Sequence, residues 1–170
     1  MNKLTLPHDE DFEKIESFVQ SGAEHRTIAI VCATYCERYV AKMIATKLPA
    51  LTPELHAELF QPTGPLGPAV TRYKLAFAMG LLGDRLFHDL KMLAKIRNIF
   101  AHELDVKDAH DPRIADRVKC FKSALQPSED TPEKWIEEKL HPLDNEGLFI
   151  YHMVLFPIHL RRRMGEIEGN

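Results

Sequence analysis

Hydrophobic residues recur every three or four positions along most of the chain, and no stretch alternates strictly between apolar and polar residues. The first pattern is typical of amphipathic α-helices, whereas alternation is typical of half-buried strands. The predicted helices span residues 9–21, 23–47, 53–60, 69–82, 84–102, 112–125, 132–140 and 144–164. The sequence therefore predicts an all-α fold, a single-domain helical bundle of about six to eight helices over residues 1–170.

We expect the helix predicted over residues 84–102 to be the element around which the others are arranged. At about 100° per residue, it has one apolar face and an opposite polar face. The apolar face carries Leu86, Leu90, Leu93, Phe100 and Ala101. The polar face carries Asp84, His88, Lys91, Lys95, Asn98 and His102. We expect the polar face to meet solvent or a ligand, with Lys91, Lys95, Asn98 and His102 as binding residues.

Arg97 breaks this division, because it lies on the apolar row of the same helix. A guanidinium that points inward needs a partner, since removing a lone charge from water is costly. Glu37 lies on an apolar row of the helix predicted over residues 23–47, and we predict that it pairs with Arg97. Glu24 is the second candidate. In the alternative interpretation, Glu37 pairs at a helix edge with a basic residue of its own helix or with water.

Two further segments have informative compositions. Residues 61–68 hold three prolines and two glycines, which indicates a fixed, tight loop. This loop lacks the spacing of a phosphate-binding loop, and its prolines remove the N–H groups that hold an anion. The helix predicted over residues 144–164 is too apolar for the surface of a monomer. It either fills the centre of the bundle or forms a subunit interface.

Composition excludes some classes of protein. The formal net charge of −3 argues against a dedicated DNA-binding domain, which usually has a strong basic excess. The three cysteines, Cys32, Cys36 and Cys120, form no CxxC pair, and we interpret them as reduced core residues, with a redox or metal role as the alternative. The longest apolar run, residues 27–36, is far shorter than a membrane span. The N-terminus has no apolar signal core, so we expect a cytoplasmic protein without a membrane segment.

The motif Arg97-Asn98-x-x-x-His102 is the one with specific chemistry. A histidine can act as general base or acid on a ribose hydroxyl, and an arginine can stabilise a charged phosphorane. On a regular helix, however, Arg97 and His102 point about 140° apart. Catalysis therefore requires a looser helix after Ile99 or a second subunit. In the alternative interpretation, Arg97 anchors the helix and His102 caps its carbonyls. No HExxH or paired His/Cys spacing is present, so we expect no metal and no cofactor.

Three segments in order, Gly64–Gly67, Arg72–Leu82 and Arg97–His102, resemble the mannitol operon repressor family. Members carry a GPLG loop, an LAYALGLI-type helix and a KIRNxFAH helix end. The resemblance implies an all-helical regulator that lowers the expression of mannitol-uptake genes. It implies no helix-turn-helix, and none is evident here, so action through a protein partner is expected. Arg97, Asn98 and His102 are also similar to the RNxxxH motif of the HEPN superfamily, in which the Arg and His meet across a dimer.

Two hypotheses follow. The first, which we favour, is a non-enzymatic transcriptional regulator that forms a homodimer through apolar helices and binds a protein partner, with no direct contact to DNA. The second is an HEPN-like, metal-independent endoribonuclease, or a protein that binds RNA or nucleotides. In the second hypothesis Arg97, Asn98 and His102 are the catalytic residues. The candidate binding residues are Arg97, Asn98, His102, Lys91, Lys95 and Glu37.

Overall fold

The computed structural model of the chain describes residues 9–122 and 142–168. Within these ranges the backbone forms seven α-helices and no strand, which confirms the predicted all-α class. The helix predicted over residues 132–140 lies outside the described residues. The helices are α1 (Asp9–Gln20), α2 (His25–Thr46), α3 (Pro53–Phe60), α4 (Ala69–Ala78), α5 (Asp84–His102), α6 (Pro112–Val118) and α8 (Asn145–Glu168).

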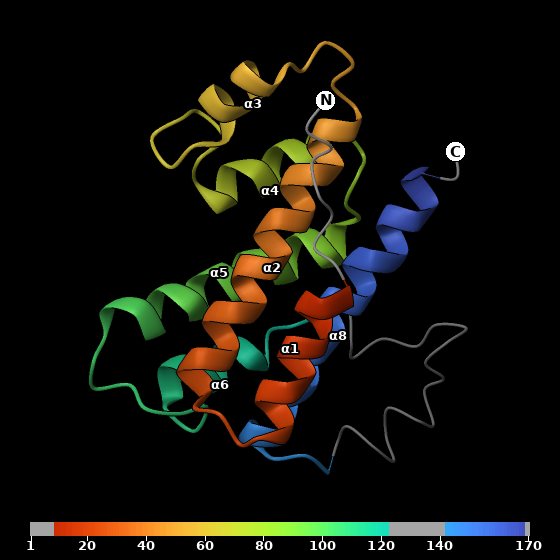
Figure 1. Cartoon of the computed structure of the whole chain (residues 1–170). Helices are drawn as coiled ribbons and strands as arrows, with labels where there is room; N and C mark the ends of the chain where they lie inside the picture. The colour runs from red at the N-terminus through yellow and green to blue at the C-terminus, as the bar shows by residue number, and fades with distance from the viewer. Residues whose placement is uncertain (1–8, 123–141, 169–170) are drawn as a thin grey trace.

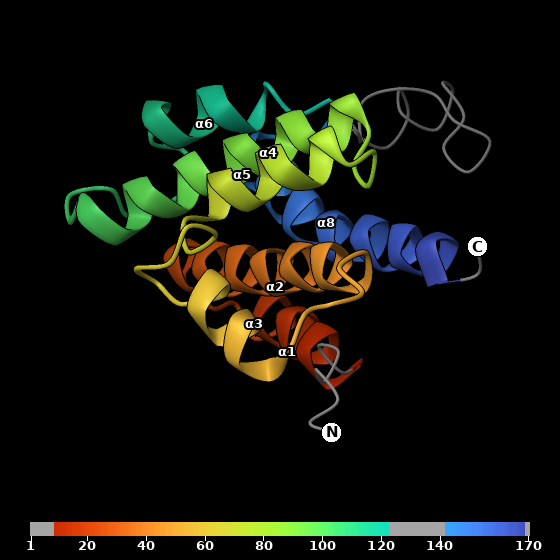
Figure 2. The same cartoon turned by 90° about the horizontal axis from the view of Figure 1, so that it is seen from above.

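The second helix, α2, is the centre of the bundle. It packs against α8, α5, α4 and α1, and Figure 2 shows it between α1 on one side and α4 and α5 on the other. Its sequence is apolar on nearly all sides, so it can bury residues against each of these neighbours. Ala29, Cys32, Ala33, Cys36, Val40, Met43 and Ile44 are all completely buried.

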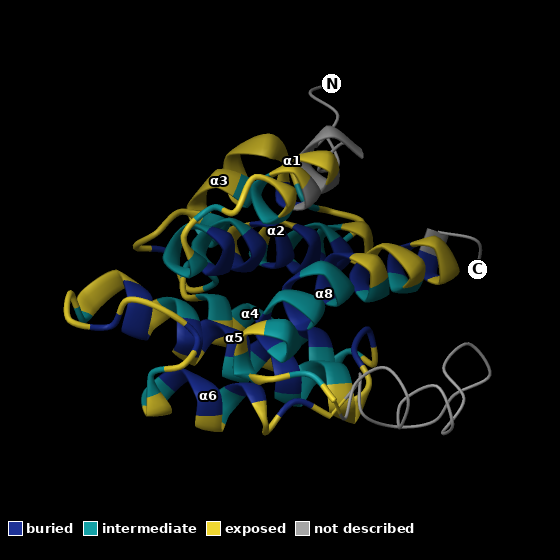
Figure 3. Ribbon diagram, turned by 90° about the horizontal axis from the view of Figure 1, so that it is seen from below, coloured by how far each residue is buried: buried dark blue, intermediate teal, exposed yellow. Residues whose placement is uncertain are grey.

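The predicted faces of α5 are largely present. Leu90, Leu93 and Phe100 are completely buried, whereas Leu86 is only half-buried and Ala101 is exposed. The last turn of α5 projects past the first turn of α2 (Figures 1 and 2). Figure 3 shows exposed positions gathered on this projecting end of α5.

The fourth helix ends at Ala78, four residues before its predicted end at Leu82. Gly80 adopts a positive φ of 70°, a conformation that favours glycine. The amide of Leu81 then donates to the carbonyl of Ala76 at 2.9 Å, and the Gly80 amide donates to Phe77 at 2.9 Å. These two bonds form a Schellman motif, which turns the chain into α5.

The loop of residues 61–68 is folded tightly against the end of α3, as its composition predicts. The amide of Leu66 donates to the carbonyl of Leu59 at 2.8 Å, and Arg72 donates to the carbonyl of Gly67 at 3.1 Å. A Cβ atom at Gly64 would lie 2.3 Å from the carbonyl oxygen of Glu58. The glycine is therefore required by close approach of two backbone segments.

The sixth helix ends at Val118 rather than at the predicted Leu125. The backbone amide of Lys122 donates to the buried carboxylate of Asp89 at 2.8 Å. An amide used in this contact is not available to the Val118 carbonyl, to which it would donate in a continuing helix. The chain turns away as a result, and Cys120 is exposed rather than buried.

The last described helix, α8, packs into the bundle on one side and meets solvent on the other. Phe149, Met153, Phe156 and Leu160 are completely buried, whereas Ile158 is 44% exposed. The inner face makes its most extensive packing against α2. A search of the described helices finds none that is long and apolar enough to span a membrane.

Candidate functional surface at the end of α5

The polar face predicted on α5 points away from the bundle. Lys95, Asn98 and His102 are exposed, and Lys91 is half-buried. The Lys91 ammonium lies 4.4 Å from the centre of the Phe87 ring, which is a cation–π distance. The orientation of this face is therefore as predicted, and its role as a binding surface stays a prediction.

Arg97 does not pair with Glu37, and this prediction is wrong. Glu37 instead accepts a hydrogen bond from Arg72 of α4 at 3.2 Å. Arg72 also donates to the Gly67 carbonyl, and this second bond holds its guanidinium beside Glu37. Glu37 therefore belongs to the contact between α2 and α4 and not to the surface of α5.

The guanidinium of Arg97 stays at the side of its own helix. Its Nη1 donates to Asn98 Oδ1 at 3.0 Å, while its Nε is buried and has no hydrogen-bond partner among residues 9–122 and 142–168. His102 is exposed on the outer face. Its side chain makes no capping hydrogen bond to a backbone carbonyl of the described residues. The structure thus joins Arg97 to Asn98 and leaves His102 apart from them.

The loop that follows α5 is fixed to the start of α2 by two residues that the sequence analysis did not select. Arg26 Nη2 donates to the carbonyls of Glu103 at 3.2 Å and Val106 at 2.8 Å. The amide of Ala109 donates to Nδ1 of His25 at 3.0 Å. The sequence signal for this role is the presence of two polar residues, His25 and Arg26, at the start of an otherwise apolar helix. A polar residue beside a buried helix end often serves the backbone of another segment.

A cluster of charges fixes the same loop from its other side. Arg113 donates to Glu103 at 2.6 Å, to Asp105 at 2.7 Å and to Asp111 at 2.8 Å. These charge-assisted bonds lower the pKa of Asp105 and lower that of Asp111 to about 2. All three carboxylates consequently share one guanidinium, and Asp105 and Asp111 stay ionised at neutral pH.

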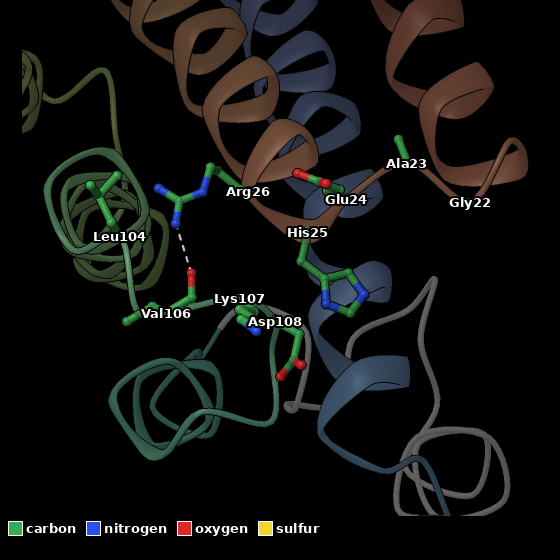
Figure 4. A pocket seen from close by; sticks show the side chains of 9 residues that line it. All are labelled: Gly22, Ala23, Glu24, His25, Arg26, Leu104, Val106, Lys107 and Asp108. Carbon is green, nitrogen blue, oxygen red and sulfur yellow. Dashed lines mark hydrogen bonds between the residues drawn. The ribbon is translucent and has the colours of Figure 1, made fainter.

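Between this loop and the start of α2 lies a cavity of about 560 Å³, shown in Figure 4. Leu104 stands at its rim with 86% of its surface exposed, although it is a large apolar residue. The cavity is lined by Gly22, Ala23, Glu24, His25, Arg26, Leu104, Val106, Lys107 and Asp108. Apolar and polar groups therefore meet at one open site.

No group of three His, Cys, Asp or Glu side chains that could hold a metal ion occurs among the described residues. Cys32 and Cys36 are reduced and buried, as predicted, and burial raises the pKa of the Cys36 thiol well above its ordinary value. A thiol in this state is a packing group rather than a nucleophile.

Comparison with known proteins identifies the family of this chain. No curated protein matches it. A chain in the "X-ray structure of the MtlR-HPr complex from Escherichia coli" has a similar fold, with a TM-score of 0.63 and 17% sequence identity. The similarity covers 91% of the present chain and 98% of that chain. Residues 56–153 match the family described as MtlR, mannitol repressor. Because this match includes more than half of the 170 residues, the chain belongs to the mannitol repressor family.

Proposed function

We propose that this chain is a regulator that lowers the expression of mannitol-uptake genes by binding a protein, and that its partner is HPr. It acts without a helix-turn-helix and without direct contact to DNA. The proposal fits the family of the chain and its net charge of −3, which gives DNA no general electrostatic attraction.

One observation carries this proposal. A relative with the same fold over 91% of this chain was crystallised as a complex with HPr. A shared fold places similar helices at similar positions, although 17% identity leaves most surface residues different. The surface that receives a partner must therefore be found from the residues of this chain.

The direct test is a calorimetric titration of the full chain with HPr from the organism that encodes it. We expect saturable one-to-one binding with a Kd of about 1 µM or tighter, since a specific interface of standard size supports this affinity. The control is an electrophoretic assay with the DNA upstream of the mannitol-uptake genes, in which no shift is expected. Absence of binding at about 100 µM HPr, together with a DNA shift, would contradict the proposal.

We also propose that the chain forms a homodimer through apolar residues on the outer face of α8. Ile158 is 44% exposed there, and Val154 and Leu155, on adjacent turns, are only half-buried. A second copy packed on this row would remove these side chains from water. Light scattering on the purified chain should give twice the monomer mass of 19.5 kDa. A mass of one chain at all concentrations would exclude the dimer.

A further inference from the structure

Leu104 differs from the other exposed apolar residues among the described parts of the chain. Its exposed fraction is 86%, compared with 40% for Leu55, 36% for Val70 and 44% for Ile158. These other three residues lie on helices, and more than half of each is covered. Leu104 instead stands on the rim of the 560 Å³ cavity, as Figure 4 shows. A single exposed leucine is ordinary on a protein surface, but one beside a cavity has the geometry of a binding site.

The exposure of Leu104 does not come from a loose backbone. Arg26 binds the carbonyls of Glu103 and Val106, one residue before Leu104 and two after it. Val106 itself is completely buried, and its amide donates to the Glu103 carbonyl at 3.3 Å. The loop is thus ordered before any partner arrives. An ordered binding loop loses less conformational entropy on association, which favours affinity.

The charges around Leu104 are predominantly negative. Arg113 serves three carboxylates, so its cluster retains two negative charges in excess. Asp108 has 51% of its side chain exposed and adds a further charge, as does Glu24 on the far wall. The Arg26 guanidinium, which donates to neutral backbone carbonyls, and Lys107 are the cations of the lining, so the charges named here leave a net excess of two negative charges. The site is therefore an apolar projection within an acidic rim.

We propose that Leu104 and the adjacent cavity form the docking site for the protein partner. The partner surface has an apolar depression that receives Leu104, and lysine or arginine side chains that face the acidic rim. This inference rests on the proposed function, because it locates the surface on which that function depends. Charge complementarity of this kind fixes the partner and its orientation.

The experiment compares HPr binding by wild type and by variants of the full chain, using the same calorimetric titration. Leu104→Ala is expected to weaken binding at least about tenfold, and Leu104→Asp more, since a few residues near the centre of an interface usually carry most of the binding energy. Leu55→Asp is the matched control. It introduces the same charge at an exposed leucine of α3, at the opposite end of α2, and should leave binding unchanged (Figure 1).

Two charge reversals at neighbouring residues test the proposed attraction between the acidic rim and a basic partner surface. Asp108→Lys removes a negative charge from the rim and should weaken binding, whereas Lys107→Glu adds one and should strengthen it. Both residues are exposed, so neither change is expected to unfold the chain. Shifts of both variants in the same direction would contradict a basic partner surface.

The outcomes separate this inference from the proposed function. Binding by wild type that is lost in the Leu104 variants and kept in Leu55→Asp supports the docking site. Wild-type affinity in Leu104→Ala and Leu104→Asp would overturn the docking site and leave the proposed function intact. No HPr binding by wild type would overturn both. Circular dichroism confirms that each variant is folded before its affinity is compared.

Discussion

His152→Phe is expected to be more stable than wild type in acid and to lose most of the pH dependence of unfolding between pH 7 and pH 4. His152 is completely buried, and neither of its ring nitrogens has a hydrogen-bond partner among the described residues. Its ring instead packs on Phe121, with 4.5 Å between the ring centres, and on Phe156. Phenylalanine has a similar shape and fits such an aromatic site without unpaired nitrogens.

The sign follows from the pKa of this group in each state. Burial lowers the pKa of His152 to about 4, although the nearby charge of Asp89 acts in the opposite direction and His159 adds to the lowering. In the unfolded chain the pKa is about 6.5. Above that pH the group is neutral in both states and contributes nothing. As the pH falls toward 4, only the unfolded state gains the proton, so the folded state loses stability by about 3 kcal/mol.

Urea unfolding at a series of pH values measures this effect. The wild-type free energy of unfolding should fall steadily from pH 7 to pH 4, and His152→Phe should show a much smaller slope. Some slope remains, because burial also lowers the pKa of His159. His56→Phe on α3 is the control and should behave as wild type, since His56 lies outside the core. Equal slopes for His152→Phe and wild type would contradict the assignment.

Gly67→Ala is expected to lower the melting temperature by roughly 5–10 °C, which corresponds to about 2–3 kcal/mol in a chain of this size. A Cβ atom at this position would lie 2.4 Å from the carbonyl oxygen of Pro62 and 2.5 Å from that of Gln61. Both contacts are with backbone, so the loop itself must move. Because Arg72 binds the Gly67 carbonyl and also Glu37, the movement disturbs the link between α4 and α2.

Gly83→Ala gives the matched comparison. A Cβ atom at Gly83 meets nothing within 4 Å, and the backbone there has a φ of −78° that any residue adopts. Restricting the unfolded chain should leave this variant as stable as wild type or more stable by about 0.5 kcal/mol. Scanning calorimetry of the two variants decides the matter. Equal melting temperatures would show that the loop tolerates the extra methyl group.

The sequence was sufficient to predict which segments are helical, because the apolar period identifies an amphipathic helix directly. The predicted bounds of α3 and α5 coincide with those observed, and Thr52 caps α3 by accepting a hydrogen bond from the Leu55 amide at 3.2 Å. The errors concern ends that tertiary contacts decide. The end of α6 depends on a buried carboxylate from α5, which no local pattern indicates. The end of α4 depends on Gly80, for which Gly83 was an equally good candidate by residue type.

The site was harder to predict, because it is formed by residues distant in sequence. The spacing of apolar residues in α5 predicts which face points outward. It does not predict which residue a charged side chain pairs with. Glu37 pairs with Arg72 and not with Arg97, because the packing of α4 places Arg72 beside α2. The loop after α5 has no period, so its polar composition indicated solvent exposure and gave no sign of its order. That order comes from His25 and Arg26, about eighty residues earlier in the chain.

The most direct measurement is amide hydrogen exchange of the full chain with and without HPr. HPr is expected to slow exchange in residues 102–108 and 22–26, the two walls of the cavity beside Leu104, and to leave exchange in α3 unchanged. Slower exchange confined to α3, or to the outer face of α8, would contradict the proposed docking site. Identical exchange with and without HPr would contradict the claim that this chain acts by binding that protein.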